Sequence, residues 1–60
     1  MVAIFEIRNT VNGKFYWRFK AGNGEVGAVS EVYETKQGCE TGISSIMSSA
    51  IFATIKDQTI

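Results

Sequence analysis

The pattern of apolar and polar positions is clearest in residues 14–20, where the two kinds of residue alternate strictly. One side of this segment carries Phe15, Trp17 and Phe19, and the other carries Tyr16, Arg18 and Lys20. Alternation with a period of two is typical of a strand that buries one face. Asn-Gly pairs at 12–13 and 23–24 bound the segment and predict a turn at each end. We therefore predict a central strand with a neighbouring strand on either side.

A first strand is predicted over Val2–Arg8, and the alternation selects its register. A two-residue loop at Asn12-Gly13 would place Ile7 opposite Arg18 and mix the two faces. A three-residue loop instead puts Gly13 at the left-handed position that such loops need. The opposing pairs then become Ile7 with Trp17, Phe5 with Phe19, Glu6 with Arg18 and Thr10 with Lys14. Apolar pairs lie on one face and an ion pair on the other, so the bulged loop is favoured.

A third strand is predicted after a two-residue type I′ turn at Asn23-Gly24, which pairs Gly22 with Glu25. Phe19 then faces Ala28, Trp17 faces Ser30 and Phe15 faces Val32. The core positions of this strand are Val26, Ala28, Ser30 and Val32, and the outer positions are Val29, Glu31 and Tyr33.

Thr35 is the predicted N-cap of a helix whose apolar positions recur at intervals of three and four. These positions are Cys39, Gly42, Ile43, Ile46, Met47 and Ala50. Gly38 and Gly42 each cost roughly 1 kcal/mol relative to alanine, so the helix needs the sheet for its stability. Gly42 lies within the apolar stripe, where we expect it to leave room for an aromatic ring.

Alternation over Phe52–Lys56 predicts a short last strand, which must pair with a sheet edge of this subunit or of a neighbour. The predicted fold class is α+β, in the order βββαβ. It consists of a three-stranded antiparallel meander, one helix packed on one face, and the short C-terminal strand. We expect a single domain over residues 1–60.

With these elements placed, the chain resembles the YegP-like domain-of-unknown-function family. The resemblance rests on FEIR at residues 5–8 and on YWRFKAGNGEVGAVSEVYETKQGCETGI at residues 16–43. It implies three antiparallel strands, a helix and a last strand, in members that carry one copy and pair as dimers or carry two tandem copies. Departures from the family pattern include Arg8 after FEI, Val32 in place of a glycine, and Thr41 before Gly42. The family supplies no activity that could be carried over.

Length and composition favour association over other ways of stabilising a small domain. A chain of 60 residues buries a marginal core, and one cysteine without histidine gives neither an intrachain disulfide nor an ordinary zinc site. We therefore expect a homodimer and no metal or cofactor. No apolar run suits a signal peptide or a membrane span, and the reduced Cys39 suits the cytoplasm.

Candidate chemistry is sparse. Cys39 near the helix start has no histidine as a base and falls on the packed stripe, so we read it as core and expect no enzyme. Arg8, Tyr16, Arg18 and Lys20 form a candidate binding face, but the zero net charge favours a solvated surface that Glu6 and Glu31 neutralise. The candidate dimer interface comprises Ile4, Val29, Tyr33 and Phe52.

Two functions follow from these residues. The first is a non-catalytic, homodimeric module that binds another protein or a small ligand. The alternative is weak nucleic-acid binding through the basic and aromatic face of the second strand, which the zero net charge does not favour.

Overall fold

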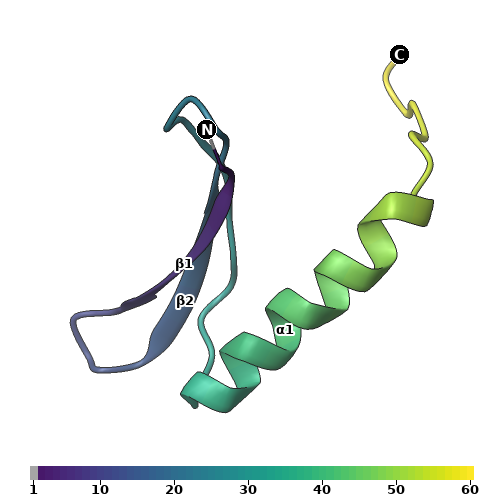
Figure 1. The fold of residues 1–60 in the computed structure, drawn as a ribbon. Coiled ribbons are helices and arrows are strands. Elements are labelled where there is room, and N and C mark those ends of the chain that lie inside the picture. The colour runs from purple at the N-terminus through teal and green to yellow at the C-terminus, as the bar shows by residue number, and fades with distance from the viewer. Residues whose placement is uncertain (1) are drawn as a thin grey trace.

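The computed structural model describes residues 2–60 and confirms the predicted α+β class. Its strands are β1 (Ile4–Asn9), β2 (Phe15–Lys20) and β3 (Val26–Val29), which form an antiparallel sheet in the order β1-β2-β3. The helix α1 (Lys36–Ser49) follows, and one turn of 3₁₀ helix, η1 (Ala50–Phe52), extends it. The helix lies on one side of the sheet (Figure 1).

The hairpin that joins β1 and β2 has the predicted register. Ile7 pairs with Trp17, Phe5 with Phe19 and Glu6 with Arg18. The loop is closed by the Thr10 N–H, which donates to the Lys14 carbonyl at 2.9 Å, and Gly13 adopts a φ of 82°. A left-handed φ strains most residues but not glycine, which explains why this position ends the loop.

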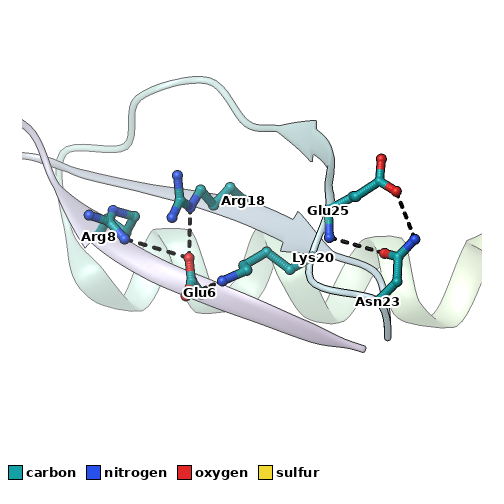
Figure 2. A network of polar contacts seen from close by, with 6 residues as sticks. All are labelled: Glu6, Arg8, Arg18, Lys20, Asn23 and Glu25. Atoms are coloured by element: carbon teal, nitrogen blue, oxygen red, sulfur yellow. Dashed lines mark hydrogen bonds and ion pairs between the residues drawn. The ribbon is translucent and has the colours of Figure 1, made fainter. Parts of the chain in front are cut away.

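The predicted type I′ turn between β2 and β3 is wrong. That turn requires a positive φ at both central residues, whereas only Gly24 (φ 88°) has one and Asn23 does not. The loop has three residues, like the first, and is closed by the Ala21 N–H, which donates to the Glu25 carbonyl at 2.8 Å. Asn23 reinforces it, because its side-chain oxygen accepts a hydrogen bond from the Glu25 N–H (Figure 2).

A bulge after this loop restores the predicted pairing of Phe19 with Ala28. Lys20 pairs with Val26, so Gly27 is the extra residue between the two pairs. Val26 therefore lies on the face of Lys20 and not in the core, which corrects its prediction. Trp17 and Ser30 face each other as expected, since the Trp17 N–H donates to the Ser30 hydroxyl at 2.8 Å.

A further irregularity beyond Ser30 corrects the predictions for Val32 and Tyr33. Phe15 pairs with Tyr33 and not with Val32, which is 54% exposed. Tyr33 thereby moves from the predicted outer face to the helix side, where its ring lies beneath Gly42. A Cβ at Gly42 would lie 2.9 Å from the Tyr33 Cζ, so the expected close approach of a ring to Gly42 is confirmed.

The helix begins as predicted and packs mainly through its first half. The Thr35 hydroxyl caps it by accepting a hydrogen bond from the Gly38 N–H at 3.0 Å. Cys39 is completely buried, whereas Ile46 is 40% exposed and Met47 is 61% exposed. Figure 1 shows the same trend, with the C-terminal end of α1 farther from the strands than its N-terminal end.

The strand predicted over Phe52–Lys56 does not form in residues 2–60. Phe52 ends η1, Ala53 has an extended backbone, and residues 53–60 carry no regular structure. This segment leads away from the sheet (Figure 1) and pairs with neither edge strand, β1 or β3, of its own subunit. Within the same described residues, no helix has the length and apolar character needed to cross a membrane.

Candidate functional site

The surface of the sheet opposite the helix carries a cluster of charged side chains centred on Glu6. We call this surface the outer face, and it consists of Glu6, Arg8, Tyr16, Arg18 and Lys20. Strand alternation puts these residues on one side, and register places Glu6 opposite Arg18 and Arg8 opposite Tyr16. Figure 2 shows the charged side chains in front of the sheet, with the helix passing behind it. All four predicted residues of the binding face are therefore brought together.

Three cations share the single carboxylate of Glu6. The Arg18 Nε lies 2.6 Å from Glu6 Oε1, the Arg8 Nη1 lies 3.6 Å from the same oxygen, and the Lys20 Nζ lies 3.7 Å from Oε2. The hydrogen bond from Arg18 is the largest cause that holds the pKa of Glu6 below its ordinary value. Glu6 is thus ionised at neutral pH, and three positive charges against one negative charge leave this cluster with a formal charge of +2.

Glu31, which one interpretation of the sequence expected to neutralise the outer face, forms no ion pair within 4.0 Å among the described residues. Among the described residues, the acidic partners within 4.0 Å of a cation are Glu6 and Glu34, and Glu34 pairs with Lys14 at 3.2 Å. The sequence predicted the pair of Glu6 with Arg18 but not that Arg8 and Lys20 also contact the Glu6 carboxylate. The missed signal is the spacing of Arg8, two residues from Glu6 on the same strand, and of Lys20, diagonally across from it on β2; both side chains are long enough to reach Glu6.

An apolar groove separates the C-terminal half of α1 from the sheet. It has a volume of about 250 Å³ and is lined by Phe5, Trp17, Phe19, Ala28, Ile46 and Ala50. Phe5 packs edge-on against Trp17, with ring centroids 5.2 Å apart. A second hollow, along β1, shares Phe5 and includes Ile43 and Met47. The groove was not expected, because the apolar stripe of the helix predicted contact along its whole length.

The core next to the groove is small. Among residues 2–60, the buried apolar side chains are Trp17 and Cys39. The indole N–H of Trp17 is buried and has no hydrogen-bond acceptor within residues 2–60. Cys39 is a free thiol whose pKa is raised, first by burial and then by the charge of Glu40. A buried, protonated thiol packs as a small apolar group and is a poor nucleophile.

The four residues of the predicted dimer interface do not form one surface. Ile4 and Val29 flank the outer face on different edge strands, where they are paired with Lys20 and Arg18. Phe52 is 80% exposed in η1 at the far end of the helix. Tyr33 lies under the helix, as described above. Three further exposed apolar residues, Ile51, Phe52 and Ile55, lie in η1 and in the segment that follows it.

Comparisons with known proteins agree with this fold. Residues 11–57 match the family model described as "Domain of unknown function (DUF1508)". The chain is 52% identical over 50 residues to a UPF0339 protein of Treponema denticola, covering 83% of this chain and 86% of that protein. It is 40% identical over 55 residues to the UPF0339 protein YegP of Escherichia coli, covering 92% of this chain but only 50% of that protein.

A solved structure extends the likeness to three dimensions. The solution NMR structure of a protein from Haloferax volcanii superposes with a TM-score of 0.81 at 32% identity, covering 92% of this chain and 93% of that one. Relatives of one domain length and of twice that length therefore share this sequence pattern. The chain belongs to the DUF1508 family of UPF0339 (YegP-like) proteins, whose function is unknown.

Proposed function

We propose that this domain is a non-catalytic interaction module whose working unit is a homodimer, with the partner covering the apolar groove. The observation that carries the proposal is the surface left uncovered by the single chain. Its accessible area is 4949 Å², whereas a compact folded protein of this mass exposes about 3,900 Å². The excess of about 1,000 Å² is similar to the roughly 800 Å² that each partner buries in a standard interface.

The shape of the chain supports the same interpretation. Its radius of gyration is 13.2 Å, whereas a compact chain of this length has a radius of about 10 Å. The surplus comes from the diverging helix end and from residues 53–60, which are the parts that carry Ile51, Phe52 and Ile55. A second copy that covers these residues and the groove would turn two small cores into one larger core.

The charge distribution argues that the dimer does not form through the outer face. Two copies stacked by this surface would bring two clusters of formal charge +2 together, which is unfavourable in a desolvated interface. The groove is lined by apolar side chains, so a partner that covers it removes few polar groups from water and the desolvation cost is small. We place the interface on the helix side, and we retain the cytoplasm as the proposed location because a free, buried Cys39 suits a reducing compartment.

The C-terminal segment gives the proposed dimer a specific contact. Residues 53–60 pair with neither edge strand of their own subunit, and β1 presents an edge of six residues whose outward N–H and C=O groups are unpaired in residues 2–60. Open strand edges readily accept another extended segment. We propose that residues 53–60 of one copy lie against β1 of the other, with Ile55 facing its apolar surface.

Hydrogen–deuterium exchange tests this contact. We expect the β1 amides to become more protected as protein concentration rises into the dimeric range, because backbone pairing shields them from solvent. Ile55→Asp should leave β1 exchanging as fast as it does in dilute wild-type protein. Gln58→Asp adds the same charge to the same segment on the other side and should behave like wild type. Protection of β1 that is independent of concentration, or equal in Ile55→Asp, would remove the segment from the interface.

A further inference from the structure

The outer face offers a surface that the proposed dimer does not use. Glu6, Arg18 and Lys20 are only 24–30% exposed and are held in a fixed arrangement, whereas the Arg8 side chain is 47% exposed. The half-buried ring of Tyr16 lies on the central strand, opposite Arg8 and two residues from Arg18. The cluster therefore combines an excess of positive charge with one aromatic ring on an open sheet surface.

We propose that this surface binds single-stranded nucleic acid, with Arg8, Arg18 and Lys20 contacting phosphates and Tyr16 stacking on a base. Arg18 and Lys20 are two residues apart on one strand, which separates them by about 7 Å. This spacing is comparable to the separation of neighbouring phosphates in an extended nucleic-acid strand. Arginine can bind a phosphate with two parallel N–H donors, and lysine binds it as a point charge.

The aromatic ring distinguishes a nucleic acid from an acidic polypeptide as the partner. Both would be attracted by the formal charge of +2, but only a nucleic acid also brings a flat base that gains from stacking. Sheet surfaces that combine basic side chains with exposed rings bind single strands in this way, with little sequence preference. A duplex offers no free base face, so a single strand fits this surface better.

Glu6 sets the strength of the interaction. It holds all three cations, so a phosphate must compete with its carboxylate for the same donors. Binding by the wild-type domain should therefore be weak and confined to low salt. Removal of the Glu6 charge should strengthen binding, because the cluster then carries a formal charge of +3. A face that is only a solvated surface would show no such gain.

Fluorescence anisotropy with a labelled oligothymidylate of about 12 nucleotides, within the site size of small single-strand binders, tests the proposal. Three phosphate contacts predict a slope of log K against log salt of about −2, which should shrink by about 0.7 in Arg18→Gln. Glu6→Gln should tighten binding several-fold, and Tyr16→Leu should weaken it on the order of tenfold with an unchanged slope. Lys36→Gln, a loss of positive charge in the helix, is the control and should change nothing.

Circular dichroism of each variant separates a lost contact from a lost fold. The absence of any anisotropy change at low salt, for both wild type and Glu6→Gln, would overturn the proposal. Equal affinity for polyglutamate, unaffected by Tyr16→Leu, would overturn it in favour of an acidic polypeptide. Neither result depends on the oligomeric state, so the proposed dimer stands or fails separately.

Discussion

Replacing Ile46 by glutamate is expected to convert the proposed dimer into a monomer at micromolar concentration. Ile46 lines the apolar groove and is 40% exposed in the single chain, so the proposed partner covers it. Burying a carboxylate there without a partner costs several kcal/mol, which weakens association by about 100-fold or more. Glutamate is at least as good a helix former as isoleucine, so α1 should persist. Sedimentation velocity measures the mass, and circular dichroism measures the helix.

Ser45→Glu is the matched control for this substitution. Ser45 is the neighbouring residue, is exposed, and does not line the groove. It receives the same charge on the same helix, so an effect of net charge alone would appear in both variants. We expect Ser45→Glu to remain dimeric. An Ile46→Glu protein that is as dimeric as Ser45→Glu would show that the groove lies outside the interface.

Gly42→Ala is expected to destabilise the domain, although the same change in most helices is stabilising. Alanine gains about 1 kcal/mol over glycine in a helix interior. At Gly42, the added Cβ would lie 2.9 Å from Cζ and 3.3 Å from Cε1 of the Tyr33 ring, which is half-buried beneath the helix. Separating the helix from the ring costs more than the gain, so we expect a net loss of about 1–3 kcal/mol in the free energy of unfolding. Urea denaturation at one fixed protein concentration measures it.

A double-mutant cycle with Tyr33→Leu assigns that loss to the ring. Without the ring, the methyl group introduced at position 42 has room, so Gly42→Ala should cost less in the Tyr33→Leu background than in wild type. Ser45→Ala, on an exposed part of the same helix, should stabilise by a few tenths of a kcal/mol and shows the ordinary effect of propensity. A Gly42→Ala protein that is more stable than wild type would contradict the packing of Tyr33 under α1.

The sequence was sufficient for the first hairpin because two constraints agree there. Alternation over β1 and β2 excludes a one-residue slip, and a three-residue loop with Gly13 at its left-handed position then pairs Phe5 with Phe19. The N-cap at Thr35 was equally accessible, since its hydroxyl and the apolar spacing after it are local features. Both predictions rest on interactions within a few residues or across one tight turn.

The pairing of β2 with β3 and with the residues after it was harder to predict, because its irregularities leave little trace in the alternation of apolar and polar residues. The loop at Gly22–Gly24 is one residue longer than predicted, and the bulge at Gly27 offsets this error at Phe19 and Ala28. A further irregularity then moves Tyr33 to the helix side. Each glycine is compatible with a bulge, but none shows where pairing shifts.

The sequence predicted which residues share the candidate site but not the charge that the site carries. Strand alternation correctly grouped Arg8, Tyr16, Arg18 and Lys20 on one face. The charge of that face depends on the contacts that Arg8 and Lys20 make with Glu6 and on which other acidic side chains pair with it, which periodicity does not specify. The groove likewise depends on the angle of α1, and an apolar stripe specifies which residues face the sheet but not how closely they approach it.

Sedimentation equilibrium of the wild-type chain tests the central claim most directly. A homodimer at micromolar concentration predicts a molar mass twice that of the 6.6 kDa chain, decreasing toward the single-chain value on dilution. This result would account for the excess exposed surface and for the extended shape of the single chain. A mass of one chain throughout the micromolar range would contradict the dimer, and the groove would then need another occupant.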